Sequence, residues 1–175
     1  MVSKTYEDLY MEKLYAPWRT EYVTKDDKKV KGCVFCHIVN HLDDDEELVV
    51  LYRDKEFFIV MNKYPYSPGH FMIIPNLHTA NLEDVDKEVF AKISIYAQKG
   101  VMLLKDVLKA EGVNIGMNLG SAGGAGIAEH IHMHLVPRWT GDTNFVTSIA
   151  KTRVYSSDFE KIYKRLKEQS ENYFR

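Results

Sequence analysis

The stretch HIHMHLV at residues 130–136 decides the fold of this chain, because histidines and apolar residues alternate along it. Successive side chains of a strand point to opposite faces, so we expect the three imidazoles on one face and Ile131, Met133 and Leu135 on the other. Alternate imidazoles would lie about 7 Å apart, too far for all three to touch one atom without strand twist. A strand over 130–139 is therefore expected, with one chemical face and one face in the core.

Further strands are expected before this stretch, and together they form an antiparallel sheet. Pro65, Pro68 and Gly69 forbid a continued ladder between two of them, so a loop is expected over 63–69. The apolar, β-branched and aromatic runs that predict these strands are LVVLYR at 48–53, FFIVMN at 57–62, HFMIIP at 70–75 and VNIGMNLG at 113–120.

Two helices are expected besides the sheet. Apolar residues with a period of about 3.6 over 89–108 predict a long helix, which is capped by Asn81 or Asp86 and ends near Gly112. Gly100 inside it costs about 1 kcal/mol relative to alanine, which indicates close packing or a local irregularity. A second helix is expected over about 156–169, with Ser156 or Ser157 as its cap and Phe159, Ile162, Tyr163 and Leu166 on its apolar face.

The fold class is therefore α+β, an antiparallel sheet with one long helix and a C-terminal helix packed on it. The 175 residues fit one structural domain in three parts. Residues 1–42 form an N-terminal arm with a short helix around 6–14, residues 43–150 form the main domain, and residues 151–175 carry the C-terminal helix. The acidic run at 43–47 predicts a solvated loop between the arm and the main domain.

Composition argues against several classes of function. No run of about 18 apolar residues occurs, and the start MVSKTYEDLY is charged where a signal peptide is apolar, so we expect a cytoplasmic protein without a membrane partner. The 23 Lys and Arg against 25 Asp and Glu give a net charge of −2, which argues against nucleic acid as a partner. Small phosphorylated ligands remain compatible with this charge.

Two further motifs carry chemistry. The loop GSAGGAG at 120–126 lets backbone N–H groups approach a phosphate next to the imidazole face, although a merely flexible connector is the alternative. Cys33 and Cys36 have the spacing of a zinc ligand pair, and two more ligands would have to come from elsewhere. A redox dithiol and two unligated buried cysteines are the alternatives for this pair.

Taken together, these motifs resemble the histidine triad (HIT) superfamily of nucleotidyl hydrolases and transferases. The triad pattern His-x-His-x-His, with an apolar residue at every x, matches 130–136, and the resemblance covers roughly residues 30–145. YAPWR at 15–19 and PRWTGDTNF at 137–145 are similar to the branch of prokaryotic diadenosine tetraphosphate phosphorylases and hydrolases. The remaining motifs in the family's order are CVFC at 33–36, Asn62, PGH at 68–70, IP at 74–75, His78 and NLG at 118–120.

The resemblance implies a HIT-like sheet and cleavage of a dinucleoside polyphosphate at the α-phosphorus, by hydrolysis or phosphorolysis. His132 would attack to give a nucleotidyl-histidine intermediate, a role that suits an imidazole that is neutral near pH 7. His134 would contact the phosphates or the leaving group. No catalytic cofactor would be required, and a homodimer is implied.

The resemblance also implies five nucleotide-binding residues. N–H groups around Gly126 and Ile127 would hold phosphate oxygens, whereas many relatives have Gln followed by Ser or Thr at these two positions and use their side chains. Asn62 would bind ribose hydroxyls, Val60 would border the base, and Asn118 would meet phosphate or ribose. Core packing is the alternative for Val60, and a turn at a strand end is the alternative for both asparagines.

Zinc-containing relatives imply the two missing metal ligands. They complete the site with a histidine after the third strand and with the first triad histidine, which here are His78 and His130. A closed site of Cys33, Cys36, His78 and His130 would be structural and would tie the arm to the sheet. For His70, both support of the active site and a hydrogen-bonded histidine at a strand end remain open.

Two other functions stay open beside this enzyme. His-x-His pairs on strands also ligate zinc or iron, so the triad could hold a catalytic metal. The second alternative is a nucleotide-binding sensor whose triad turns over too slowly to matter. It predicts binding that survives His132→Ala together with negligible cleavage.

Overall fold

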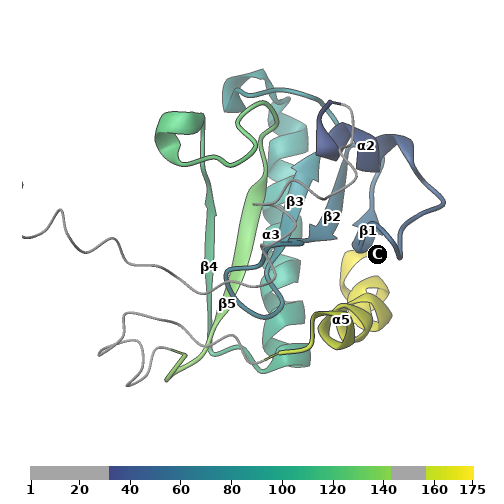
Figure 1. Ribbon diagram of the computed structural model, residues 1–175, viewed down its shortest axis with the longest axis vertical. Helices are drawn as coiled ribbons and strands as arrows, with labels where there is room; N and C mark the ends of the chain where they lie inside the picture. Colours follow the sequence, from purple (N-terminus) through teal and green to yellow (C-terminus); the bar gives the residue numbers. More distant parts are fainter. Residues whose placement is uncertain (1–31, 143–156) are drawn as a thin grey trace, which may run out of the picture.

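The computed structural model describes residues 32–142 and 157–175, which fold around a five-stranded antiparallel sheet (Figure 1). The strand order is β1-β2-β3-β5-β4, so β1 and β4 are the two edges. The α+β class expected from the sequence is confirmed. The strands are β1 (Val50–Arg53), β2 (Phe57–Met61), β3 (Phe71–Pro75), β4 (Gly112–Met117) and β5 (Met133–Arg138).

Three helices surround the sheet, α2 (Val34–Asn40), α3 (Lys87–Leu108) and α5 (Phe159–Phe174). Alternate strand residues divide the core into two clusters. Ile59 and Ile73 face the cluster that holds the buried side of α3, whereas Val60 and Met72 face the cluster that holds Phe35 of α2. The long helix and the short one therefore cover opposite faces of the sheet.

The long helix α3 follows the sequence prediction closely. The Asp86 side chain caps it and accepts hydrogen bonds from the N–H groups of Glu88 and Val89. A Cβ atom on Gly100 would lie 2.8 Å from side-chain atoms of both Leu135 and Phe71. Close packing of the helix on the sheet is therefore the reason for this glycine, as one of the two predicted explanations states.

Strand β5 begins at Met133, so the prediction of a strand from residue 130 is wrong at its start. The reason lies in the backbone, because the N–H of Ile131 donates to the carbonyl of Thr79 in the loop after β3 instead of joining the ladder. The other four strands are each slightly shorter than predicted. The helix α2, which includes Cys36, is absent from the sequence prediction.

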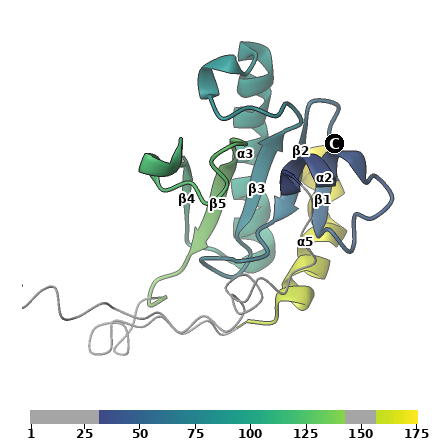
Figure 2. The ribbon, with the colours of Figure 1, turned by 45° about the horizontal axis from the view of Figure 1, so that its top comes forward.

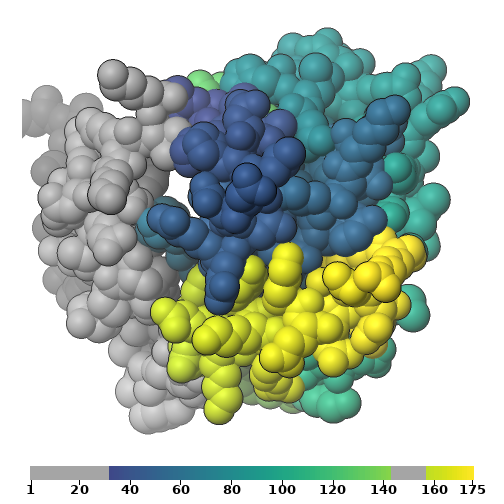
Figure 3. All heavy atoms as spheres, turned by 90° about the vertical axis from the view of Figure 1, so that its right-hand side faces the viewer, coloured from purple at the N-terminus to yellow at the C-terminus, as the bar shows by residue number. Residues whose placement is uncertain are grey.

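The C-terminal helix α5 covers the outer edge of β1 (Figures 2 and 3). Lys167 Nζ donates to the Val50 carbonyl at 2.8 Å, and Ser170 Oγ donates to the Leu51 carbonyl at 3.0 Å. An exposed strand edge invites pairing with another chain, so these side chains close one edge of the sheet. Within the described residues, β4 pairs with β5 alone, and its other edge remains open.

Two details of this helix differ from the prediction. Its cap is Asp158, whose side chain accepts from the N–H of Lys161, rather than Ser156 or Ser157. A carboxylate at this position also complements the helix dipole. The helix continues to Phe174, because that ring is fully buried and extends the apolar face beyond residue 169.

Several expectations lie outside the described residues: the short helix at 6–14, the motif at 15–19 and residues 143–145 of the post-triad motif. The acidic run forms turns, and one of its carboxylates is not merely solvated, since Asp45 pairs with Arg53 at 2.6 Å. None of the described helices is both long and apolar enough to cross a membrane.

Candidate active site

The three triad histidines are buried on the α2 side of the sheet. His134 is the cross-strand neighbour of Met72, and the Phe35 ring contacts His130 and His132 with centroid distances of 5.4 and 5.2 Å. The centroids of the His132 and His134 rings are 4.8 Å apart, closer than the predicted 7 Å. Only His134 belongs to the strand, so the extended spacing does not apply to this pair.

Each triad ring is oriented by its own partner, and the partners define the tautomers. His130 Nε2 lies 2.9 Å from the carbonyl oxygen of Pro75, so Nε2 carries the hydrogen and donates it. The lone pair of His130 Nδ1 then faces the two cysteine sulfurs, at 3.4 Å from Cys33 Sγ and 3.8 Å from Cys36 Sγ. The Nδ1 atom of this ring therefore faces the cysteines.

His132 has the opposite orientation. Its Nδ1 lies 2.8 Å from the carbonyl oxygen of His130, so Nδ1–H donates and the lone pair is on Nε2. Burial lowers the pKa of His132 below its ordinary value, which keeps the ring neutral near pH 7. A neutral imidazole with a free Nε2 is a nucleophile that needs no separate base.

His134 is held by a second buried histidine, His70. The N–H of Tyr66 and the Asn62 amide nitrogen lie 3.2 and 3.3 Å from His70 Nδ1, which therefore accepts. His70 Nε2–H then donates to His134 Nδ1 at 3.0 Å. The remaining hydrogen of His134 lies on Nε2, a buried atom without a hydrogen-bond partner in the described part of the chain. Within the described residues, this N–H is therefore a hydrogen-bond donor that is not used by the protein.

The pKa values of this pair fit the same assignment. The pKa of His70 is lowered to about 3, mainly because the ring is buried and to a smaller extent because the His134 and His132 rings lie beside it. The pKa of His134 is lowered to about 4, mainly by burial and to a smaller extent by the neighbouring His132 ring. Both rings are neutral at neutral pH, so His134 offers a hydrogen-bond donor and not a positive charge.

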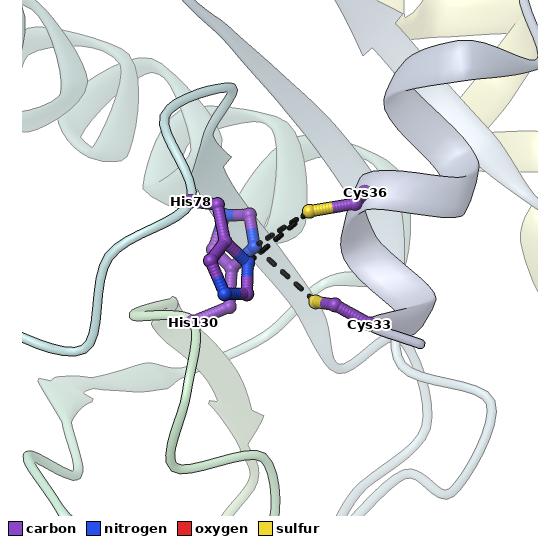
Figure 4. A group of neighbouring side chains, drawn as sticks. All are labelled: Cys33, Cys36, His78 and His130. Atoms are coloured by element: carbon purple, nitrogen blue, oxygen red, sulfur yellow. Dashed lines mark hydrogen bonds between the residues drawn. The ribbon is translucent and has the colours of Figure 1, made fainter. Parts of the chain in front are cut away.

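Four side chains, one of them the triad's His130, gather in an arrangement that suits a metal ion (Figure 4). The ligand atoms of Cys33, Cys36, His78 and His130 all lie within 4.8 Å of one another. Cys36 Sγ is 3.2 Å from His78 Nδ1. Zinc–sulfur and zinc–nitrogen bonds of ordinary length place tetrahedral neighbours about 3.6 Å apart, so these distances fit a single bound ion.

Three of the five predicted nucleotide-binding residues lie on or directly after strands, and they differ in exposure and in hydrogen bonding. Val60 is 2% exposed and packs in the cluster with Phe35. Both groups of the Asn62 side chain are engaged, since its oxygen also accepts from the N–H of Tyr64 at 2.9 Å. Asn118 follows β4 and is partly exposed.

The glycine loop folds onto itself except at its end. N–H groups of Gly123, Gly124 and Ala125 donate to carbonyl oxygens within the loop. Within the described residues, no backbone hydrogen bond uses the N–H of Gly126 or Ile127. These two donors are the ones predicted to bind phosphate, and that role stays a prediction.

Sequence reasoning missed two features of this site. Phe35 stands in the sequence as a mere spacer between the cysteines, although its buried ring contacts two triad histidines. The partner of His70 could not be identified either, because His134 lies 64 residues away in the chain. The register of β3 and β5 would have been needed to bring these two histidines together.

A family model, the HIT domain, matches residues 44–141, which is more than half of the chain. The chain belongs to the HIT family. The AP-4-A phosphorylase of Mycobacterium tuberculosis is 37% identical over 151 residues, which are 82% of this chain and 76% of that protein. The resemblance stated from the sequence is thereby confirmed at the level of the family.

Two solved HIT structures have the same fold. The Zn-bound histidine triad family protein from Mycobacterium smegmatis has a TM-score of 0.66 and 31% identity, covering 81% of this chain and 94% of that one. A hypothetical histidine triad nucleotide-binding protein from Sulfolobus tokodaii has a TM-score of 0.64 and 31% identity, covering 80% and 93%. The cysteine pair lies ahead of the segment that the family model matches.

Replacement of His70 by glutamine is expected to flatten the dependence of stability on acid pH. The unfolded chain takes up a proton on His70 below about pH 6.5, whereas in the folded protein its pKa is about 3. Between these values the unfolded state binds the extra proton, so the free energy of unfolding falls as the pH falls. His70→Gln should reduce that slope by up to about 1.4 kcal/mol per pH unit.

Urea unfolding between about pH 7 and about pH 4 measures this slope. The control is Gln98→Asn, which changes an exposed residue without an ionisable group and should therefore leave the slope at its wild-type value. Equal slopes for wild type and His70→Gln would show that His70 is not held neutral in the folded protein.

Proposed function

We propose that this HIT protein cleaves dinucleoside polyphosphates of the diadenosine tetraphosphate type at the α-phosphorus, as a nucleotide hydrolase or phosphorylase. The observation that carries the proposal is the opposite orientation of two neighbouring rings: among the described residues, His132 keeps a free Nε2 lone pair and His134 has an unpartnered Nε2–H. The M. tuberculosis relative, named as an AP-4-A phosphorylase, supports the substrate class.

The first step joins the nucleotide to His132. Its Nε2 attacks the α-phosphorus, an N–P bond forms, and the bond from phosphorus to the leaving polyphosphate oxygen breaks. The modified ring is cationic, and its Nδ1–H continues to donate to the His130 carbonyl, which stabilises the charge. His134 Nε2–H donates a hydrogen bond to the leaving phosphate, and N–H groups around Gly126 and Ile127 hold the oxygens on phosphorus.

The second step returns the enzyme to its starting state. Water or inorganic phosphate attacks the α-phosphorus, the N–P bond breaks, and the electron pair returns to His132 Nε2. Water releases its proton to solvent and gives a nucleoside monophosphate, whereas phosphate gives a nucleoside diphosphate. Asn62, Val60 and Asn118 would border the ribose, the base and the phosphates of the retained nucleotide.

The metal-dependent alternative finds less support. In the described ranges, His130 is the one triad residue that belongs to a group of three or more metal-ligating side chains. His132 and His134 direct their Nδ1 atoms at a carbonyl and at another imidazole, and they do not converge on one point with His130. This arrangement favours nucleophilic catalysis over a catalytic metal.

Loss of the His132 imidazole is expected to abolish the covalent adduct and to slow cleavage by at least about 10³-fold, since a missing nucleophile removes the covalent path. The wild-type protein and His132→Ala are incubated with diadenosine tetraphosphate, and the adduct is measured by mass spectrometry. Chromatography separates the products: ADP and ATP indicate phosphorolysis, and AMP and ATP indicate hydrolysis.

His41→Ala is the control for this experiment, because that exposed ring lies outside the site and should leave turnover unchanged. If the wild type binds the nucleotide tightly but does not cleave it, the proposal is contradicted. The alternative of a nucleotide-binding sensor would then be favoured. Equal cleavage by wild type and His132→Ala would exclude His132 as the nucleophile.

We propose that Cys33, Cys36, His78 and His130 bind a structural zinc ion. The donor set and its distances fit tetrahedral coordination. When bound, the ion would fix helix α2 against the sheet and leave the reacting phosphate without a metal contact. The similarity to the Zn-bound protein of M. smegmatis supports zinc as the metal.

Removal of one ligand is expected to abolish metal binding and to lower the melting temperature. Cys36→Ser should lose its zinc, and at metal concentrations of about 100 to 1,000 Kd the lost stabilisation corresponds to about 5 to 15 °C. Elemental analysis and thermal unfolding measure the two effects. The control is His37→Ala, which changes the next residue of the same helix and should keep one zinc per chain.

We also propose a homodimer that forms across β4. Ile115 lies on the α3 side of this edge strand and its side chain is exposed. Because α5 closes the β1 edge, β4 presents the open edge together with the exposed apolar side chain of Ile115. A second copy of the chain would cover both.

A charge on this surface is expected to separate the two copies. Ile115→Glu should shift the mass measured by light scattering from that of a dimer to that of a monomer, because burial of an unpaired carboxylate is unfavourable. Leu42→Glu is the control, since Leu42 is exposed elsewhere and should not affect the mass. A monomeric wild type would contradict the proposal.

A further inference from the structure

Helix α2 carries two ligands of the proposed metal site together with a ring that contacts the proposed nucleophile. Cys33 directly precedes the helix and Cys36 lies in its first turn, and both face the two histidines of the metal-binding group (Figure 4). Phe35 stands between the two cysteines, and it is the one residue of α2 whose side chain is buried. The same short segment therefore reaches both sites.

The two ends of α2 are held in different ways. At the C-terminal end, the Arg53 guanidinium donates to the carbonyls of Ile38 and His41 at 2.9 and 3.0 Å. At the N-terminal end, the Cys33 side chain makes no capping hydrogen bond, and the first turn has no acidic residue. A helix of seven residues is not stable by itself, so coordination of both thiols to a metal ion would fix this turn.

The ring of His132 contacts two other rings. The Phe35 ring lies 5.2 Å away at an interplanar angle of 56°, and the His134 ring lies 4.8 Å away at 81°, measured between centroids. The hydrogen bond from Nδ1 fixes one atom of the His132 ring and leaves the ring free to tilt about it, so the two neighbouring rings determine where Nε2 points. His134 belongs to β5, whereas the position of Phe35 depends on α2.

We propose that Phe35 is a positioning residue that makes the attack by His132 depend on the metal. The inference rests on the proposed function and on the proposed zinc site. With both thiols coordinated, the first turn of α2 is fixed and the Phe35 ring holds His132 in the orientation for attack. Without the metal, the turn and the ring shift together and Nε2 is misplaced. A misplacement of about 1 Å is sufficient to slow a reaction by about 10²-fold.

A second route connects the same two sites. His130 belongs to the metal-binding group, and its carbonyl accepts the hydrogen bond from His132 Nδ1. Loss of the metal would disturb His132 by this route even if Phe35 had no part in the effect. Metal loss combined with a change of Phe35 separates the two routes, because effects that act through one contact do not add.

The effect of metal loss is therefore measured with and without the Phe35 ring. Cys36→Ser removes the metal from the wild type and from Phe35→Leu. The rate constant of adduct formation on His132 is measured at saturating diadenosine tetraphosphate, where the affinity for the nucleotide has no influence. In the wild type, metal loss should slow this step about 10- to 100-fold.

Phe35→Leu should be slowed to a similar extent while it still binds zinc. Metal loss should then slow it further by less than about 3-fold, because the contact that transmits the effect is already gone. Equal effects of metal loss in both proteins would overturn the inference, since the coupling would then run through His130. A wild type that binds no zinc would overturn it as well.

A measurement without substrate makes the test independent of the proposed function. Proton–nitrogen correlation spectra of the histidine side chains should show His132 in the zinc-loaded wild type with its hydrogen on Nδ1. Metal loss should change these nitrogen signals in the wild type and leave them unchanged in Phe35→Leu. If the signals respond in this way but no adduct forms, the proposed function is wrong and the coupling through Phe35 stands. Signals that respond equally in both proteins overturn the coupling.

Phe58→Leu is the matched control. Phe58 is 1% exposed and packs in the same cluster as Phe35, but among the described residues its ring contacts no triad histidine. This variant should keep the wild-type rate and the full effect of metal loss. Phe35→Met fills the space with a flexible chain and should behave like Phe35→Leu. Loss of the metal effect in Phe58→Leu would overturn the inference, because any loosening of the core would then be sufficient.

Discussion

Four imidazoles are buried on one side of the sheet, and each of their nitrogens needs a partner because a buried polar atom without one is costly. His130 makes three such contacts, two through its ring nitrogens and one through its backbone carbonyl. Its Nε2–H donates to Pro75, its Nδ1 faces the cysteines, and its carbonyl accepts from His132 Nδ1. The Cys/His group proposed to bind zinc and the proposed nucleophile His132 are thus both in contact with His130, so displacement of His130 would disturb both.

The rest of the fold makes this arrangement rigid. On the opposite face, the contact of α3 with Phe71 and Leu135 at Gly100 leaves no room for even one additional carbon atom. Leu135 directly follows His134, so the close helix contact fixes the strand that carries this histidine. The C-terminal helix completes the sheet at β1 through side-chain donors to backbone carbonyls, which concentrates the open edge at β4.

Much of this could be predicted from the sequence, because it depends on local alternation. The placement of the triad on one side of the sheet follows from the two-residue period, and the Asp86 cap follows from the helical period that begins after it. Contacts between distant segments could not be predicted in this way. The Ile131–Thr79 hydrogen bond shortens β5, and the His70–His134 pair depends on the β3–β5 register, which no local pattern specifies.

The neutral state of the triad rings determines how the site would bind a polyphosphate, the proposed substrate. Burial lowers the pKa of His132 and His134, so His132, the proposed nucleophile, keeps its lone pair, but the two rings offer no positive charge to a polyphosphate. An anion that enters this environment must find hydrogen-bond donors instead, since uncompensated burial of its charge would be prohibitive. In the part of the chain that the structure describes, the Nε2–H of His134 and the N–H groups of Gly126 and Ile127 are such donors, since none of them has a protein acceptor there. The dipoles of these donors can stabilise the added charge of the transition state while His132 stays neutral. Positively charged imidazoles would also stabilise this charge, but a protonated His132 would have no lone pair for the attack.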